Sequence, residues 1–257
     1  MSDFLSLKGK RGLVVGVANE DSIAWACARA FHELGAELAM TYVNDKALPW
    51  VRPLAERVHA SLFMPCDVRE PGQLESVFET IEAEWGQLDF LLHSIAFAPR
   101  DDLHARVVDS SQAGFLQAMD VSCHSFLRMA HMAEPLMPRG GALLTVSFYG
   151  AEKVVEDYNL MGPVKAALEA SVRYAAAELG PQGIRVHALS PGPLKTRAAS
   201  GIQRFDDLLE RARQRAPQDN LADIDDVGAA AAFLVSDRAR TITGNTTYID
   251  AGYHVVG

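Results

Sequence analysis

Short apolar runs alternate with longer amphipathic stretches along most of the chain. The runs are rich in Val, Leu and Ile and have the length of buried strands. In the interval after the first run, Ile23, Ala26, Ala30 and Leu34 recur on one side of a helix that spans residues 22–34. We expect strands at residues 11–17, 37–42, 61–65, 88–94, 142–147, 184–190 and 246–249, with helices in most of the intervals.

This alternation predicts an α/β fold, namely a single-domain doubly wound Rossmann fold with a seven-stranded parallel sheet. Length alone would also permit two small domains, but no linker, repeat or low-complexity run divides the 257 residues. We therefore expect one domain over residues 1–257. Ligands of such folds bind beyond the carboxyl ends of the strands. The residues that follow predicted strands should converge there: Gly16, Asp67, Ser94–Ala98, Ser147 and Pro191.

The loop after the first predicted strand has the length of a phosphate-binding turn. Dinucleotide folds place a pyrophosphate there, against free backbone N–H groups at a helix N-terminus. Residues 16–24 lack the usual G-x-G-x-x-G and keep one glycine, Gly16, at the strand end. Ser22 at the helix start can touch phosphate or simply cap the helix, and the residues alone leave both open.

Tyr158 and Lys165 form the strongest candidate pair. If a helix opens at this stretch, seven residues make about two turns, so the phenol and the ammonium share a face. A tyrosine can donate a hydrogen bond to a reacting oxygen, and a fixed positive charge favours the negative charge that develops there. A packed tyrosine and a surface lysine are the alternative. Because of Pro163, the helix should begin near Asn159 or slightly later.

The composition excludes several classes of function. A net charge of −9 argues against a nucleic-acid surface, and no apolar run approaches the length of a membrane span. The N-terminus has no secretion signal. Cys27, Cys66 and Cys123 are odd in number and widely spaced, which indicates reduced thiols of a cytoplasmic protein. No His/Cys cluster indicates a metal.

Taken together, these segments resemble the NADH-dependent enoyl-[acyl-carrier-protein] reductases, a divergent branch of the short-chain dehydrogenase/reductase superfamily. Ordinary members of the superfamily space the catalytic pair as Tyr-x-x-x-Lys, whereas this branch has Tyr-x6-Lys, as here, with Met161 at the ordinary tyrosine position. The other matching segments lie in the family's order at Gly16-x5-Ser22-Ile23-Ala24 and at residues 41–46, 66–68, 93–98, 190–196, 199–202, 225–228 and 242–244.

The resemblance implies reduction of trans-2-enoyl thioesters, on acyl carrier protein or CoA, in fatty acid biosynthesis. It implies catalytic roles for Tyr158 and Lys165. The implied NAD-binding residues are Gly16, Ser22, Ile23, Val43, Asp67, Val68, Ser94, Ile95, Ala96, Lys165, Pro193, Leu194 and Thr196. The implied substrate-binding residues are Ala98, Phe148, Tyr149 and Tyr158.

Several of these roles have simpler alternatives. Asp67 can be a helix N-cap instead of an adenine contact, and Lys195 and Arg197 can be solvated loop charges. His93 is expected to be a satisfied buried histidine, and His187 receives no role. NADH is expected over NADPH, because no cation precedes Lys46 after the second strand.

The chain departs from the family at two places. Phe148 stands where relatives often carry a second tyrosine, so Phe148 becomes a pocket wall and Tyr149 a weaker candidate. The second departure lies within the expected mobile lid at about residues 195–215. Gln203, Asp206 and Asp207 stand there where well-known relatives carry basic residues that meet the carrier protein. Carrier docking would then rest on Lys195, Arg197, Arg204 and Arg211. Relatives form homotetramers, and the apolar tail at residues 248–257 suggests the same assembly.

Two other functions remain open from the sequence. An ordinary short-chain carbonyl reductase or alcohol dehydrogenase would have the same fold and cofactor, but Met161 removes the tyrosine that it would use. A non-catalytic NAD-binding regulator would not need both Tyr158 and Lys165.

Overall fold

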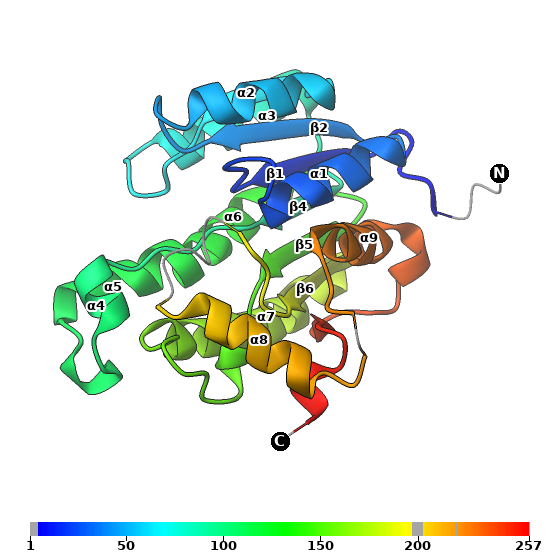
Figure 1. The fold of residues 1–257 in the computed structure, drawn as a ribbon. Helices are drawn as coiled ribbons and strands as arrows, with labels where there is room; N and C mark the ends of the chain where they lie inside the picture. Colours follow the sequence, from blue (N-terminus) through cyan, green and yellow to red (C-terminus); the bar gives the residue numbers. More distant parts are fainter. Residues whose placement is uncertain (1–4, 197–202, 219, 257) are drawn as a thin grey trace.

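Seven parallel strands form one sheet in the order β3-β2-β1-β4-β5-β6-β7 (Figure 1). The computed structural model describes residues 5–196, 203–218 and 220–256. The strand order reverses between β1 and β4, which creates the crevice where ligands of doubly wound sheets bind. The strands are β1 (Arg11–Val15), β2 (Glu37–Tyr42), β3 (Leu62–Pro65), β4 (Phe90–His93), β5 (Gly141–Val146), β6 (Ile184–Pro191) and β7 (Thr246–Ile249).

Helices cover both faces of the sheet (Figure 1). Successive strand residues point to opposite faces: Leu13 and Val15 belong to one apolar cluster and Val14 to the other. Helices α3, α6 and α7 pack on the first cluster, and α1, α2 and α9 pack on the second. The helices are α1 (Ile23–Glu33), α2 (Leu48–Arg57), α3 (Gln73–Trp85), α4 (Arg100–His104), α5 (Gln112–Met119), α6 (Ser125–Ala133), α7 (Met161–Leu179), α8 (Phe205–Arg215) and α9 (Ile224–Val235).

Helices α1 and α9 approach each other closely because Gly228 has no side chain. A Cβ at this position would lie 2.8 Å from the carbonyl oxygen of Ala26. The N-terminus of α9 is fixed by a capping box. The Asp223 side chain accepts a hydrogen bond from the Asp226 backbone N–H, and the Asp226 side chain accepts one from the Asp223 backbone N–H. This pair of helices supports β1 and β5 from the same face.

The predicted strands are present with small shifts at their ends. The second and last strands match their predicted ranges, whereas β1 ends at Val15, two residues early, and β4 spans only Phe90–His93. Gly16 directly follows β1 and has a positive φ of 110°, and a Cβ there would lie 2.0 Å from the Ser94 carbonyl oxygen. The close approach of these two strand ends therefore requires glycine at position 16.

The expected helical geometry of the candidate pair, Tyr158 and Lys165, is wrong in one respect. Helix α7 begins at Met161, so Tyr158 lies in the turn before it and the two side chains are not two turns apart on one helix. Asp157 and Asn159 on either side of Tyr158 have positive φ values of 64° and 42°. Pro163 falls in the first turn of α7, as expected.

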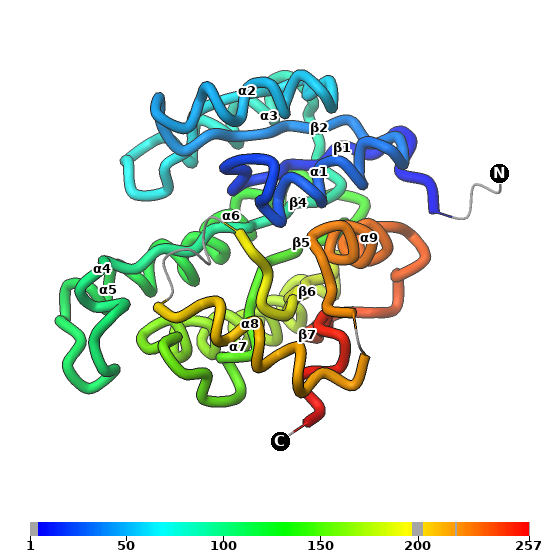
Figure 2. Tube along the Cα trace, viewed as in Figure 1, coloured from blue at the N-terminus to red at the C-terminus, as the bar shows by residue number. Residues whose placement is uncertain are grey.

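Beyond the carboxyl ends of the strands, two groups of helices flank the crevice. Helices α4 and α5 extend from the main body after β4, and α8 crosses in front of α7 (Figure 2). The expected lid range therefore contains a helix of eleven residues, α8, while residues 197–202 lie outside the described part of the chain.

Candidate active site

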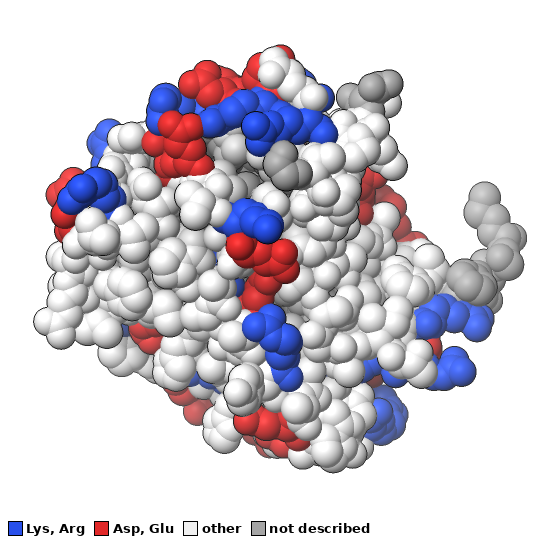
Figure 3. Space-filling view, turned by 90° about the horizontal axis from the view of Figure 1, so that it is seen from below, with Lys and Arg blue, Asp and Glu red and all other residues white. Residues whose placement is uncertain are grey.

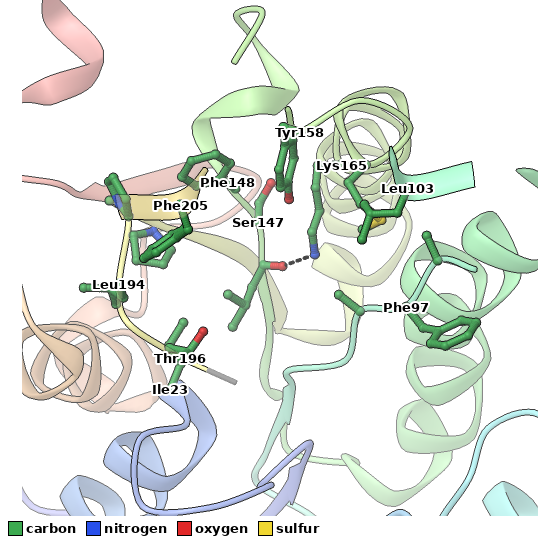
Figure 4. A pocket seen from close by; sticks show the side chains of 17 residues that line it. Ile23, Phe97, Leu103, Ser147, Phe148, Tyr158, Lys165, Leu194, Thr196 and Phe205 are labelled. Carbon is green, nitrogen blue, oxygen red and sulfur yellow. Dashed lines mark hydrogen bonds between the residues drawn. The ribbon is translucent and has the colours of Figure 1, made fainter. Parts of the chain in front are cut away.

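A cavity of about 290 Å³ opens at the carboxyl ends of β4, β5 and β6 (Figure 4). Its wall is mainly apolar, with the polar groups of Tyr158, Lys165 and Ser147 on one side. The residues around it are Ile23, Ala96, Phe97, Ala98, Leu103, Val146, Ser147, Phe148, Tyr158, Met161, Lys165, Pro191, Gly192, Pro193, Leu194, Thr196 and Phe205.

Tyr158 and Lys165 both reach this cavity. Figure 4 shows their side chains side by side, with the hydroxyl and the amine directed inwards. Tyr158 is 8% exposed, and burial raises the pKa of its phenol above the usual value of 10.0, so the group stays protonated at neutral pH. A protonated phenol next to a cation can donate a hydrogen bond to a substrate oxygen that becomes negative.

Lys165 lies in the second turn of α7 and is 4% exposed. Its ammonium donates one hydrogen bond, to the Val146 carbonyl oxygen at 2.7 Å. Burial disfavours the charged form and lowers the pKa of Lys165 from 10.5 to about 8. The group thus remains mostly charged at neutral pH and keeps further N–H donors for a ligand.

Glu169, a buried residue that was not predicted from the sequence, bonds a residue of the cavity wall. It lies one turn after Lys165 on α7, is 4% exposed, and accepts a hydrogen bond of 2.5 Å from the Ser147 hydroxyl. Burial raises the pKa of Glu169, while the Ser147 bond opposes this shift. The sequence did contain a signal for this residue, since Glu169 is a charged residue among the apolar positions of α7, and charged residues are rarely buried without a partner.

The loop after β1 contains a hydrogen bond between the Ser22 side chain and the loop backbone. This residue occupies the N-cap position of α1 without bonding the helix backbone; its hydroxyl instead donates to the Asn19 carbonyl oxygen at 2.6 Å. The capping alternative is therefore wrong for the side chain. Ile23, the next residue, lines the cavity, whereas Gly16 and Ser22 are not among the residues that line it.

The residues expected at the adenine end follow β2 and β3, on the other side of the strand-order reversal. Val43 is 42% exposed there. Asp67 does not cap a helix, since α3 begins at Gln73 with Gly72 as its N-cap. Its carboxylate instead accepts from Arg69 at 2.9 and 2.6 Å, which lowers the pKa of Asp67. Val68 is buried in the apolar cluster under α3 and α6.

The remaining residues expected to bind NAD or substrate divide into two groups. Ala96, Ala98, Pro193, Leu194 and Thr196 line the cavity. Ser94 and Ile95 do not; the Ser94 backbone N–H bonds Val15, and Ile95 packs on the sheet core.

The two aromatic candidates after β5 point to different places. Phe148 lines the cavity, as expected of a wall, and its ring packs against Tyr158. Tyr149 is not among the residues that line the cavity, so the structure does not bring it to the site expected to bind substrate. Its ring packs against Tyr248 and Tyr253 of the C-terminal segment.

The cations expected to dock a carrier protein already have acidic partners within the chain. Lys195 pairs with Asp206 at 3.3 Å, and Arg211 pairs with Glu156 at 2.5 Å. Arg204 bonds both Glu156 and Asp157. Arg197 lies outside the described residues. In Figure 3, acidic and basic side chains are mixed on the face seen from below and do not gather into one basic field.

The remaining candidates have structural explanations. His93 is fully buried between the Thr145 and Ser125 hydroxyls, at 2.9 and 2.8 Å, as expected of a satisfied core histidine. All three cysteines are buried free thiols. Within the described ranges, no group of three or more His, Cys, Asp or Glu side chains could hold a metal, and no helix is long and apolar enough to cross a bilayer.

Comparisons with known proteins agree with this geometry. The family model described as Enoyl-(Acyl carrier protein) reductase matches residues 16–254. The chain is 46% identical over 251 residues to Enoyl-[acyl-carrier-protein] reductase [NADH] 1 of Rhizobium meliloti, covering 98% of this chain and 92% of the relative. It is 45% identical over 256 residues to the NADH enzyme FabI of Nostoc, covering 98% and 99%.

Solved structures of relatives have the same fold over the same length. The enoyl-acyl-carrier-protein reductase of Anaplasma phagocytophilum in complex with NAD superposes with a TM-score of 0.94 at 48% identity, covering 98% of this chain and 96% of that chain. The Bacillus cereus enzyme, solved with NADP+ and an indole naphthyridinone, gives 0.95 at 45% identity, with 98% of both chains covered. The family model matches nearly the whole chain, and relatives from several bacteria are similar to it in sequence and fold. This chain therefore belongs to the enoyl-[acyl-carrier-protein] reductase family.

Proposed function

We propose that this protein reduces the carbon–carbon double bond of trans-2-enoyl thioesters to saturated acyl thioesters with NADH, in fatty acid biosynthesis. The observation that carries the proposal is the buried pair of Tyr158 and Lys165 at the wall of an apolar cavity. An apolar cavity fits an acyl chain, and the two polar groups fit the thioester oxygen and a cofactor hydroxyl.

The residues of the cavity fit a nicotinamide cofactor. The Lys165 ammonium has three N–H groups, of which one bonds Val146. The others would bind the hydroxyls of the nicotinamide ribose, with Ile23, Leu194 and Thr196 at the nicotinamide end. When bound, NADH supplies the hydride that adds to the β-carbon of the substrate.

Addition at the β-carbon leaves an enolate on the thioester oxygen, and Tyr158 stabilises it. Its phenol remains protonated because burial raises its pKa, so it donates a hydrogen bond to that oxygen. The positive charge of Lys165 lowers the energy of the same enolate. Protonation at the α-carbon then gives the saturated thioester.

The apolar wall keeps water from the enolate and receives the acyl chain. Phe148, Leu103 and Phe205 come from three separate segments and line the cavity that the phenol faces, with Phe148 packed against the Tyr158 ring (Figure 4). We further propose that α8 acts as part of the expected lid, since Phe205 of α8 completes this wall and water must be excluded during the reaction.

Acyl carrier protein is the proposed natural carrier of the substrate, with CoA thioesters as alternatives. An acidic carrier would have to compete with Asp206 for Lys195 and with Glu156 for Arg211. Charges at such a rim mainly accelerate association and are screened by salt. Carrier substrates should therefore show only a small advantage in kcat/KM over CoA thioesters, one that declines as salt rises. A large advantage that salt does not change would contradict this expectation.

A homotetramer is the proposed assembly, in the cytoplasm, where buried thiols such as these remain reduced. Strand β7 is at the edge of the sheet and only half buried, Val255 beyond it is 67% exposed, and Tyr174 of α7 is 74% exposed. Packing of this edge and of α7 across two-fold axes would cover them. Light scattering should give the mass of four chains; a monomer mass would overturn the proposal.

The decisive experiment for the activity follows NADH absorbance with a short trans-2-enoyl-CoA and then with a panel of ketones. Oxidation of NADH with the enoyl thioester alone is the expected result. Turnover of the ketones without the enoyl thioester would identify an ordinary carbonyl reductase, and no turnover with either would exclude the proposed reaction.

A further inference from the structure

The turn that carries Tyr158 has an unfavourable backbone conformation on both sides of the tyrosine. Asp157 and Asn159 have φ values of 64° and 42°, in the left-handed region that side chains with a Cβ rarely adopt. Asp and Asn tolerate this region better than other residues, but a turn with two such neighbours needs contacts that hold it.

Each of these two residues is held by a different wall of the cavity. The Asn159 side chain donates to the Leu103 carbonyl oxygen of α4 at 2.9 Å. The Asp157 carboxylate accepts two hydrogen bonds from the Arg204 guanidinium, at 2.9 and 3.2 Å, just before α8 begins. Leu103 and Phe205, which lie next to these contacts, both line the cavity.

A second carboxylate extends the contact along α8. Glu156 accepts from Arg204 at 2.7 Å and from Arg211, two turns into the helix, at 2.5 Å. Two guanidinium groups thus bind two adjacent carboxylates, and the forked geometry at Asp157 fixes direction as well as distance. The Asp157 side chain is only 15% exposed, whereas that of Arg204 is 56% exposed, so the carboxylate end of this ion pair is shielded and the guanidinium end is open to solvent.

We propose that Asp157 and Arg204 are positioning residues for Tyr158. The ion pair between Asp157 and Arg204 holds the α8 wall of the cavity against the turn that orients the phenol. The tyrosine is aimed correctly only when α8 is in place against the turn. The proposal deepens the proposed enoyl-thioester reduction and rests on it. It also gives Arg204 a role within the chain in place of carrier docking.

Two neutral variants remove the charges: the first keeps the shape of the side chain, and the second keeps its polarity but is shorter. Asp157→Asn keeps a residue that tolerates a positive φ, and Arg204→Gln keeps a polar side chain. With saturating enoyl-CoA, we expect each to lower kcat about tenfold and leave the KM for NADH unchanged, the pattern of a lost transition-state contact. The double variant should be no slower than the slower single variant, because both lose the same contact. Arg213→Gln on the same helix, whose partner is Glu210 of α8 itself at 3.9 Å, is the matched control and should retain wild-type kcat.

Salt and a conservative variant separate positioning from general stability. Raising NaCl from about 0.05 to 0.5 M should lower the wild-type kcat at saturation and leave Arg204→Gln unaffected, since screening acts on the ion pair. Arg204→Lys keeps the charge but not the fork and should give an intermediate kcat. Wild-type kcat in both neutral variants, or losses that multiply in the double variant, would overturn the proposal while leaving the proposed function intact if the wild type turns over.

A crystal structure of Arg204→Gln provides a test that does not depend on the substrate. In this variant the Tyr158 ring is expected to be displaced from its wild-type position or to occupy more than one position. An unmoved ring in that variant would overturn the positioning role, whatever the activity of the wild type.

Discussion

The ring of Phe148 packs against the ring of Tyr158, with centroids 4.8 Å apart and planes inclined at 58°. Phenylalanine has no hydroxyl, so this neighbour supports the tyrosine by packing and leaves it as the single phenol among the described residues that line the cavity. The stabilisation of a substrate oxyanion by a phenol therefore depends on Tyr158.

Tyr158→Phe should lower kcat by about 10²–10³ and leave the affinity for NADH almost unchanged, as expected when one oxyanion donor is lost. Steady-state kinetics with enoyl-CoA and a fluorescence titration with NADH measure the two effects. Tyr149→Phe is the matched control and should retain activity, because that ring lies among C-terminal aromatics. Equal losses in the two variants would show that the donor is misassigned.

The activity should decline as the pH rises through about 8, the lowered pKa of Lys165. Above this pH the buried ammonium loses its proton and with it the positive charge next to the substrate. Tyr158 does not account for the decline, since burial raises its pKa. The pH profile of kcat/KM, which reports the free enzyme, measures the effect.

Lys165→Arg keeps the charge and should remove the alkaline decline at a lower overall rate. Lys165→Ala should weaken NADH binding as well as turnover. A wild-type profile that stays level from pH 7 to 10 would count against a charged Lys165.

NADH should give a higher kcat/KM than NADPH. The segment after β2 presents Val43, Asn44 and Asp45 before the first cation, Lys46, so no positive side chain directly follows the strand to receive a 2′-phosphate. Val43 is 42% exposed and accommodates a longer side chain. Val43→Arg should shift the ratio of the two kcat/KM values towards NADPH, and an unchanged ratio would place the phosphate elsewhere.

Acid should destabilise the fold through its buried histidines. Burial lowers the pKa of His93 from 6.5 to about 3 and that of His187 from 6.5 to about 4. Below pH 6.5 the unfolded chain therefore binds protons that the folded chain does not, and the free energy of unfolding falls. The slope is about 1.4 kcal/mol per pH unit for each group.

Urea unfolding at several pH values between 6.5 and 5 measures this slope. The variant His93→Gln should reduce it, since one of the two groups no longer titrates. His131→Gln, at an exposed position on α6, should leave it unchanged. An identical slope in the wild type and His93→Gln would mean that His93 does not contribute.

The order and type of the main elements follow from local patterns in the sequence. Apolar runs such as that of β1 are buried on both faces of the sheet, so their positions can be predicted to within about two residues without knowing the neighbours. The spacing of Tyr158 and Lys165 made them candidates, and the family resemblance implied their catalytic roles. The structure places both at one cavity, although the helical argument was incomplete, because a turn, and not the helix, carries the tyrosine.

Tertiary structure decided which distant residues meet at the site. Leu103 and Phe205 are about a hundred residues apart, yet both line the cavity. Glu169 meets the Ser147 hydroxyl because α7 packs on β6 and on the segment that follows β5. Arg204 had the sequence character of a docking cation, but the path of the chain brings it to Asp157. Local propensity sets where strands and helices form; the partner of a charge or a phenol depends on the packing of elements remote in sequence.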